Sequence, residues 1–340
     1  MNFVAFYLPQ FHSIPENDAI YGKGFTEWNN VRTAKPLFKG HYQPHIPDKS
    51  VGWYNLLNEK FIEYQHDLAY SNGVNCFCYY YYNFSGKTLL EQPLKNVLKN
   101  KNIKNKFCLC WVHTDWYDNR FGPSKTFIQQ HYSQEEAVAL YHALAPYFED
   151  PRYITIDGRP LFVIWAPERH PLLPLYATTL REQSHMHGFS DLCLAGVEAY
   201  VGGDPSLFGL DCMIEFAPNW RKENHVSAEG EQPVRIDYDK TLQFMMHKEV
   251  PDYIRMRCIF PGWDNTARRG LHGIACVGSN PRSFSYMLGF LVEYTKKILS
   301  ESFQYIFINA WNEWGEGCHI EPDILYGDKF LRIINSYSKK

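Results

Sequence analysis

Eight short apolar runs recur along this chain, and amphipathic segments separate them. Each run is rich in β-branched or aromatic residues and is bounded by polar residues, glycine or proline. Strands that helices cover on both faces have this nearly continuous apolar pattern. The runs are Phe3–Leu8, Val74–Tyr80, Phe107–Val112, Leu161–Ala166, Leu192–Val197, Cys212–Phe216, Met256–Phe260 and Tyr305–Ala310. Their alternation with helical patterns predicts a parallel α/β sheet.

Four segments between or after these runs carry helix signals. Apolar residues recur at steps of three and four from Tyr54 to Leu68, and Ser133 with Glu136 matches a capping box. Pro281 is typical of a first helical turn. The predicted helices cover residues 54–68, 133–144, 281–298 and 326–337.

The number of predicted strands favours a closed barrel. Eight parallel strands, each followed by a helix, form a (β/α)8 TIM barrel, and such barrels commonly reach about 250 residues or more as one domain. An open doubly wound sheet is the alternative, but no Gly-x-Gly-x-x-Gly segment follows any run to bind a ligand at its switch point. We therefore expect a single (β/α)8 domain over residues 1–340.

Charge and composition exclude several classes of function. The net charge is −3 and no lysine- or arginine-rich run is long enough to follow a phosphate backbone, so nucleic acid is not an expected partner. No apolar stretch approaches the ~18 residues of a membrane span, and the first residues lack secretory-signal features, which predicts a cytoplasmic protein. The nine cysteines include no Cys-x-x-Cys pair. Cys76 and Cys78, and likewise Cys108 and Cys110, are two residues apart in apolar runs, and we expect them to be small buried hydrophobic side chains rather than metal ligands.

Two other patterns are compatible with a metal but favour simpler roles. His41 and His45 are four residues apart, yet Pro44 favours an irregular loop in which the imidazoles hydrogen-bond to sugar hydroxyls or backbone. Asp237 and Asp239 form the Asp-x-Asp pattern of metal-dependent nucleotide-sugar transferases, but they precede a predicted helix, where aspartate is a common cap. We expect neither a metal nor a cofactor.

Acids, imidazoles and aromatic rings follow most of the predicted strands. Active sites of (β/α)8 barrels lie at the carboxyl ends of the strands, and tyrosine and tryptophan offer flat faces and polar groups to sugar rings. The predicted substrate-binding residues are Tyr7, Gln10, Trp28, His41, Tyr80, His113, Asp115, Glu198, Glu215, Trp263, Asp264, Trp311 and Trp314. For Glu198 and Glu215 a structural ion pair is an equal alternative. Arg268 and Arg269 either bind an acidic sugar group or pair with Asp264.

Glu313 and Glu316 are the predicted catalytic pair. They are three residues apart in a loop after the eighth run, and Gly315 and Gly317 allow a tight turn that directs both carboxyls into one pocket. Glycosidic bond chemistry uses two carboxyl groups, one as acid and one as nucleophile or base. Two close carboxylates also raise one pKa, as an acid catalyst near neutral pH requires. The alternative is a structural role, as a helix cap or an arginine partner.

This loop also resembles a known family. Asn312–Gly317, followed by Ile320–Pro322, is similar to the Asn-Glu-Trp-x-Glu-Gly…Glu-Pro signature of the endo-α-mannosidase family of glycoside hydrolases. The resemblance is closer to the WbsX group, described as glycosyltransferases of bacterial surface polysaccharide synthesis. Further matching segments are Ala5–His12, Gly24–Trp28, Gly40–His45 and Pro261–Arg269, so the resemblance covers nearly the whole chain.

The resemblance implies a (β/α)8 barrel and a retaining mechanism. It assigns Glu313 as the base that helps the substrate's own 2-hydroxyl displace the leaving group through an epoxide-like intermediate, and Glu316 as the general acid/base. One segment departs from the group pattern Trp-Ala-Asn-Glu-Asn-Trp, because Trp111–Trp116 carries Thr114 where the group has glutamate. This departure bears on substrate identity more than on reaction class.

Three classes of function follow from these patterns. The first is an enzyme that makes or breaks glycosidic bonds with retention, acting on an oligosaccharide or polysaccharide in bacterial lipopolysaccharide O-antigen or capsule metabolism. The second is a glycosyltransferase that uses a sugar nucleotide, although the chain lacks a glycine-rich phosphate loop. The third is a non-catalytic carbohydrate-binding protein, which the change at Thr114 permits and the intact Glu313/Glu316 pair disfavours.

Overall fold

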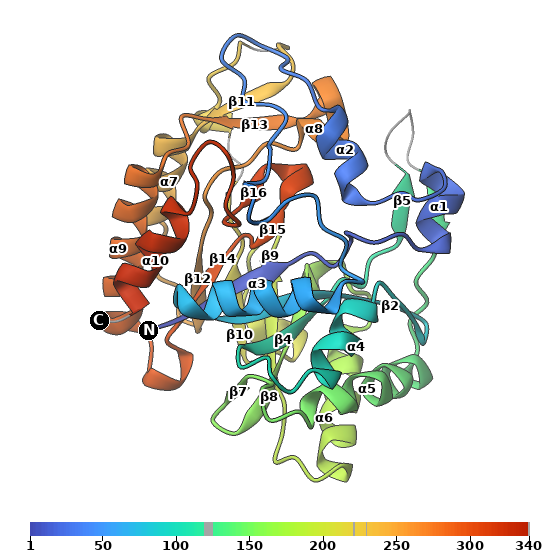
Figure 1. Cartoon of the computed structure of the whole chain (residues 1–340). Helices are drawn as coiled ribbons and strands as arrows, with labels where there is room; N and C mark the ends of the chain where they lie inside the picture. The colour runs from blue at the N-terminus through green and yellow to red at the C-terminus, as the bar shows by residue number, and fades with distance from the viewer. Residues whose placement is uncertain (119–124, 220–221, 229, 339–340) are drawn as a thin grey trace.

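Eight parallel strands close into a barrel (Figure 1). The computed structural model describes residues 1–118, 125–219, 222–228 and 230–338. The barrel strands are β1 (Asn2–Tyr7), β2 (Val74–Phe84), β4 (Lys106–Trp111), β8 (Arg159–Trp165), β9 (Cys193–Glu198), β10 (Cys212–Glu215), β12 (Arg255–Ile259) and β14 (Tyr305–Ile308). Each pairs in parallel with the next in this order, and β14 pairs with β1 to close the ring. The predicted (β/α)8 barrel is confirmed, and every predicted apolar run overlaps one of its strands.

Helices cover the outside of the barrel after most strands. They are α3 (Glu59–Ser71), α4 (Gln92–Lys99), α5 (Gln134–Phe148), α6 (Leu173–Met186), α7 (Tyr238–Met246), α9 (Pro281–Ile298) and α10 (Lys329–Ser338). Between β9 and β10 the described chain has only the short 3-10 helix η2 (Pro205–Phe208). The four predicted helices are present. α3 begins later than predicted because the Asn58 side chain caps it, accepting hydrogen bonds from the backbone nitrogens of Lys60 and Phe61.

Short elements are added to this barrel. In Figure 1, β11, β13, α2 and α8 gather at one end of the barrel, near β15 and β16. The short helices are α1 (Pro15–Tyr21), α2 (Glu27–Thr33), α8 (Thr266–Arg269), η1 (Pro167–Arg169), η3 (Lys222–Asn224), η4 (Gly270–His272), η5 (Glu301–Phe303) and η6 (Trp314–Glu316). The short strands are β3 (Lys87–Leu89), β5 (Trp116–Asp118), β6 (Lys125–Ile128), β7 (Thr155–Ile156), β11 (Val234–Asp237), β13 (Ile274–Val277), β15 (Asn312–Glu313) and β16 (Cys318–His319).

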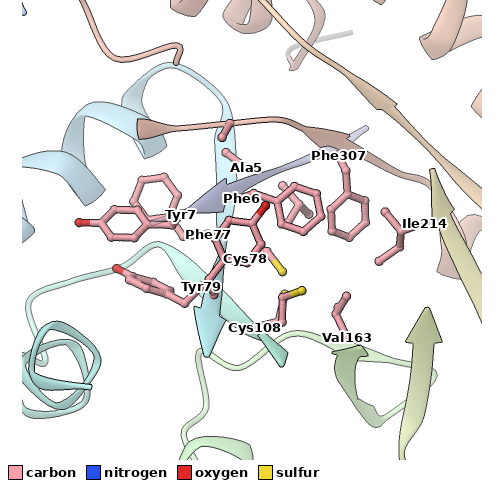
Figure 2. Close-up of a cluster of buried hydrophobic side chains, with 14 of the residues drawn as sticks. Ala5, Phe6, Tyr7, Phe77, Cys78, Tyr79, Cys108, Val163, Ile214 and Phe307 are labelled. Atoms are coloured by element: carbon pink, nitrogen blue, oxygen red, sulfur yellow. The ribbon is translucent and has the colours of Figure 1, made fainter. Parts of the chain in front are cut away.

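Alternate residues of the barrel strands point to opposite sides. Figure 2 shows Phe6, Phe307 and Ile214 turned toward one another inside the barrel, whereas Tyr7 and Tyr79 point the opposite way. The outward tyrosines contact α3, where the Tyr7 hydroxyl donates to Gln65 at 2.7 Å. All of these strand residues are buried, as expected when side chains fill the barrel and helices cover it.

The cysteines belong to the interior rather than to disulfides. All nine are free thiols, and eight of them are buried while Cys276 is half-buried. The predicted burial is confirmed for Cys76, Cys78, Cys108 and Cys110. Separately, none of the helices in the described part of the chain is both long and apolar enough to span a membrane.

The packing outside β9 leaves no room for a side chain at Gly196. A Cβ atom there would lie 2.8 Å from Pro167 and 2.9 Å from both Leu210 and Met213. We expect Gly196→Ala to destabilise the protein by about 1–3 kcal/mol, because overpacking forces neighbours to shift. Urea denaturation measures this difference. Gly203→Ala is the control, since its Cβ would meet only Phe208 at 3.6 Å; equal stability of the two variants would contradict the prediction.

Candidate active site

The loop after β14 folds back as a tight hairpin. β15 and β16 pair antiparallel, and η6 joins them. Gly317 ends the turn with φ of 55°, in the left-handed region that favours glycine. The Asn312 side chain binds both the backbone nitrogen and the backbone oxygen of Leu8, at 2.7 and 3.0 Å, which fixes the hairpin to the end of β1. This turn directs Glu313 and Glu316 to the same guanidinium.

That guanidinium belongs to Arg268 in α8, and it binds three carboxyl groups. Nη2 donates to Glu313 at 2.7 Å, and Nη1 donates to Glu316 at 2.6 Å. Nε donates to Glu27, from the first turn of α2, at 2.7 Å. Three loops that follow different barrel strands therefore meet at one side chain. The expected pairing of Arg268 with Asp264 is wrong, because its carboxyl partners are glutamates. The alternative, that Arg268 binds an acidic sugar group, stays a prediction.

Gly315 is the residue that allows this contact. A Cβ atom at this position would overlap the Glu27 carboxylate and lie 2.8 Å from Arg268 Nε. The glycine lets the backbone of the hairpin approach the Glu27–Arg268 pair closely. Glu313 and Glu316 therefore supply two carboxyls of the site, and the missing side chain of Gly315 between them leaves room for the carboxyl of Glu27.

Charge balance at this cluster favours one protonated carboxyl group. Three carboxylates face a single guanidinium, and like charges at close range disfavour full ionisation. Burial, and secondly the charge of Glu313, raises the pKa of Glu316 to about 8, although Arg268 opposes the rise. Burial also raises the pKa of Glu313, with Arg268 again opposing. Glu316 is the more open of the two, since its side chain is 21% exposed against 7% for Glu313.

Both carboxyls line a cavity of about 570 Å³ at the carboxyl end of the barrel. Its aromatic lining consists of Tyr21, Phe25, Tyr80, Tyr82, Tyr117, Trp165, Tyr200, Phe216 and Trp263. Its polar lining includes Gln10, Glu27, Asn30, Asn265, Arg268 and Arg269. Trp165 stands edge-on to both Tyr80 and Phe216, which holds these rings in place. Flat faces beside carboxyl and amide groups suit a sugar ligand.

Glu321 supports the hairpin from behind. Its carboxylate accepts four hydrogen bonds, from Gln65 at 2.6 Å, Trp314 at 2.7 Å, Tyr54 at 2.9 Å and Trp311 at 3.0 Å. Burial raises the pKa of Glu321 to about 7, and these donors favour its ionised form. Because Trp311 and Trp314 lie on either side of Asn312 and Glu313, this one carboxylate fixes the backbone that carries Glu313.

The predicted substrate-binding residues divide into groups. Gln10, Tyr80 and Trp263 line the cavity together with Glu313 and Glu316. Tyr7, Trp311 and Trp314 lie in the hydrogen-bonded layer around Glu321. Trp28 packs on Trp314 and donates to the Tyr54 carbonyl at 2.7 Å. This second group supports the hairpin rather than facing the cavity.

Glu198 and Glu215 lie in ion pairs between the barrel and its helices. Glu215 binds Arg257 at 2.6 Å and Lys248 at 3.4 Å, and Glu198 binds Lys248 at 2.9 Å. Ile214 points into the barrel, so its neighbour Glu215 points outward. Sequence analysis left substrate binding and a structural ion pair as alternatives for Glu198 and Glu215, and the observed contacts are ion pairs. Neither glutamate is among the described residues that line the cavity.

His113 and Asp115, after β4, make local contacts. The His113 ring lies 3.3 Å from both the Tyr132 hydroxyl and the Ala166 carbonyl oxygen, and Asp115 accepts from the Gln130 nitrogen at 2.8 Å. Neither they nor Thr114 belong to the described lining of the cavity. Residues 119–124, which follow, lie outside the described part of the chain, and the role of His113 and Asp115 in substrate binding stays a prediction.

His41 and Asp264 lie in a second cavity, of about 420 Å³. His41 Nε2 is 2.5 Å from Asp264, and the expected irregular loop around His41 is confirmed. His45, His319 and Asp323 share this cavity, with His45 Nδ1 3.0 Å from His319 Nε2. Burial lowers the pKa of both imidazoles to about 3, so they are neutral at neutral pH. The Asp-x-Asp segment lies elsewhere, and its Asp237 caps α7 as expected.

Several cavity residues were not predicted as ligand-binding. Glu27 appears in the sequence only as part of a family-like segment, Tyr82 lies just after the second predicted strand, and Trp165 lies within the fourth. Period-two alternation could have identified Tyr82, because it lies two residues after Tyr80 on the inward face of β2. No local pattern could have joined Glu27 to Arg268, which lies 241 residues later.

Comparison with known proteins adds family and fold. The family model described as glycosyltransferase WbsX matches residues 3–334. Uncharacterized protein WxcX from two strains of Xanthomonas campestris pv. campestris is 36% identical over 336 residues, covering 96% of this chain and 48% of the relative. The chain thus spans about half the length of these curated relatives.

Two solved structures share the fold. The GH99 endo-α-mannosidase from Bacteroides thetaiotaomicron, in complex with BIS-TRIS-propane, superimposes with a TM-score of 0.62 at 16% identity, over 99% of this chain and 96% of that one. A glycoside hydrolase-like protein superimposes with a TM-score of 0.65 at 14% identity, over 98% and 93% of the two chains. At these identities the similarity shows the barrel fold.

The four donors around Glu321 make its replacement costly. We expect Glu321→Leu to lower the free energy of unfolding by at least about 3 kcal/mol, because each buried donor left without an acceptor costs roughly 1–3 kcal/mol. Glu321→Gln should cost less, since one oxygen still accepts. Urea denaturation measures both. Glu293→Leu, at an exposed position of α9, is the matched control; a loss no larger at Glu321 than at Glu293 would refute this role.

Proposed function

The chain belongs to the WbsX glycosyltransferase family, and we propose that it makes or breaks glycosidic bonds with retention of configuration. The observation that carries the proposal is the pair Glu313 and Glu316, held by one guanidinium at the wall of an aromatic cavity. The two carboxyls differ in exposure, and the raised pKa of the more open Glu316 suits the acid role. We propose bacterial surface polysaccharide as the context of the reaction.

Glu316 acts first as the acid. Its raised pKa keeps the carboxyl protonated at neutral pH, and its partial exposure to the cavity lets it reach the bridging oxygen of a bound glycan. As the bond from that oxygen to the anomeric carbon breaks, the oxygen takes the Glu316 proton. Glu313 meanwhile accepts the proton of the sugar's 2-hydroxyl, and that oxygen forms a bond to the anomeric carbon. The product of this step is an epoxide-like sugar.

The second step reverses the roles. Glu316, now a carboxylate, accepts a proton from water or from an acceptor hydroxyl, whose oxygen attacks the anomeric carbon. The epoxide opens, and Glu313 returns its proton to the 2-oxygen. Two inversions at one carbon give net retention. Arg268 holds both carboxyls through each proton transfer and stabilises whichever of the two is the carboxylate.

The aromatic lining supplies the binding surface. Tyr80, Trp165 and Trp263 offer ring faces or edges to sugar rings, and Gln10 and Asn30 offer amides to hydroxyl groups. Arg269 is exposed at the rim and suits an anionic substituent of the glycan. Because Arg268 is bound to three glutamates, we propose that Arg269 is the residue of this pair that binds an acidic sugar group.

A sugar-nucleotide-dependent glycosyltransferase is the second candidate. The description of the family as glycosyltransferases favours it. In that reaction the leaving group is a nucleotide phosphate, which departs without a strong acid, so a carboxyl with a raised pKa at Glu316 would be unnecessary. The identity of the consumed donor separates the two candidates.

We expect Glu316→Gln to lower turnover of a glycan substrate by about 10²–10⁴-fold, the usual contribution of a general acid. An NMR time course of the wild type beside this variant, with α-linked bacterial oligosaccharides and with sugar nucleotides, measures the rate and the anomeric configuration of the product. Glu59→Gln, at an exposed position of α3, is the control and should keep full activity.

The same time course separates the outcomes. Retained configuration with wild type and loss with Glu316→Gln support the proposal. Near wild-type turnover by Glu316→Gln would remove Glu316 from the catalytic site. Consumption of a sugar nucleotide alone would establish the second candidate and exclude the epoxide route.

The raised pKa of Glu316 predicts the alkaline limb of the pH profile. The acid form persists up to about pH 8, so kcat/KM should hold below that pH and fall about tenfold per unit above it. In Glu313→Gln the second cause of the shift is lost, so Glu316 should titrate at lower pH; ¹³C NMR of labelled glutamate carboxyls measures this without activity. A titration near the ordinary glutamate range in the wild type would contradict the charge arrangement.

A further inference from the structure

We propose that His45, His319 and Asp323 bind one divalent metal ion of the zinc class in the second cavity. These three residues come from two loops that the sequence separates by more than 270 positions. The sequence led us to expect no metal, and the disfavoured metal alternative paired His45 with His41. His41 is bound to Asp264, and the partners that the fold brings to His45 are His319 and Asp323. The site is independent of the proposed reaction.

The donor atoms are close enough to converge on one ion. His45 Nδ1 and His319 Nε2 are 3.0 Å apart, and one donor atom from each of the three residues lies within 4.8 Å of the others. Zinc binds imidazole nitrogen and carboxylate oxygen at about 2.0–2.2 Å, so ligands of a tetrahedral site lie roughly 3.3 Å from one another. Side-chain movements of about 1 Å therefore complete the site.

His319 is already oriented as a metal ligand. Its Nδ1 lies 3.1 Å from the Glu321 carbonyl oxygen and donates its proton there, which leaves the Nε2 lone pair directed at His45. Its ring stacks on Trp314 with centroids 3.6 Å apart and a 17° angle between planes. Metal-binding histidines commonly donate their other ring nitrogen to a backbone carbonyl, which fixes tautomer and orientation.

The backbone holds the two ligand-bearing loops together. The Ile324 nitrogen donates to the Ile46 carbonyl at 3.0 Å, and the Asp48 nitrogen donates to the Pro322 carbonyl at 2.9 Å. Asp323 accepts from the Tyr326 nitrogen at 2.6 Å through one carboxylate oxygen. Ligands fixed in this way lose little conformational freedom when they bind an ion.

Charge and space also suit a cation. Two neutral imidazoles and one carboxylate carry one negative charge, and Asp264 adds a second beside His45. All three ligands line the cavity of about 420 Å³, and Tyr42 and Ser279 place hydroxyl groups on its wall. Nitrogen and oxygen ligands in this ratio are typical of zinc sites with a position for water.

Titration of the untagged, chelator-treated chain with Co²⁺ tests the site. We expect one equivalent to bind with visible d–d bands and no thiolate charge-transfer band, and Zn²⁺ to displace it. At a Zn²⁺ concentration of about 100 times Kd, Tm should rise by roughly 3–5 °C. A thiolate band would mean that a cysteine such as Cys276 binds the ion, and binding below about 0.1 equivalent would mean that the imidazoles only hydrogen-bond to each other; either result overturns the proposal.

Variants locate the ion. His319→Gln and Asp323→Asn should each weaken Zn²⁺ binding by more than about tenfold. His66→Gln is the matched control, because His66 is a buried histidine whose Nε2 contacts Tyr79 at 2.9 Å, away from the cavity. Wild-type affinity in Asp323→Asn and His319→Gln, or equal loss in His66→Gln, would assign the bound ion to another place. The wild-type titration stands even if His319→Gln does not fold.

Discussion

The contact of Arg268 with three carboxyl groups is the interaction on which the rest of the site depends. One guanidinium uses Nε, Nη1 and Nη2 on Glu27, Glu316 and Glu313, each at 2.6–2.7 Å. Arginine can do this because its planar fork presents several donors in fixed directions. The same contact sets the charge balance, since one cation cannot compensate three carboxylates, and it gathers loops that follow three different strands. The assembly of the pocket wall and the raised pKa of Glu316 therefore have a common cause.

The hairpin that bears Glu313 and Glu316 is held in place by hydrogen bonds on the side that faces away from the cavity. Asn312 fixes it to β1, and Glu321 fixes both flanking tryptophans through four donors. Glu316 is half-buried and Glu321 is buried, and both have raised pKa values, but their surroundings differ. Glu321 faces donors, which favour a fixed carboxylate, whereas Glu316 faces another carboxyl and an open cavity. The second environment suits the acid role that we propose for Glu316.

Much of the fold could be predicted because its signals are local. Buried strands are short and apolar, and Ser133 and Pro281 begin α5 and α9 as their caps and first turns predict. Of the site, the Glu313/Glu316 pair and Gln10, Tyr80 and Trp263 were identified, since they follow strands and the barrel brings strand ends together. Glu198 and Glu215 also follow strands, but their side chains lie among cations between barrel and helices. Position after a strand does not specify the direction of a side chain.

The sequence by itself indicated the eight strands, favoured their closure into a barrel and singled out the two glutamates of the hairpin, because apolar periodicity, glycine placement and spacing within a few residues are local properties. Only the tertiary structure decided which cation those glutamates share, which third carboxyl joins them, and which partners His45 meets. These contacts join residues hundreds of positions apart, such as Glu27 with Arg268 and His45 with His319. Closure of the barrel brings these residues together, and the sequence around either residue of such a pair does not indicate its partner.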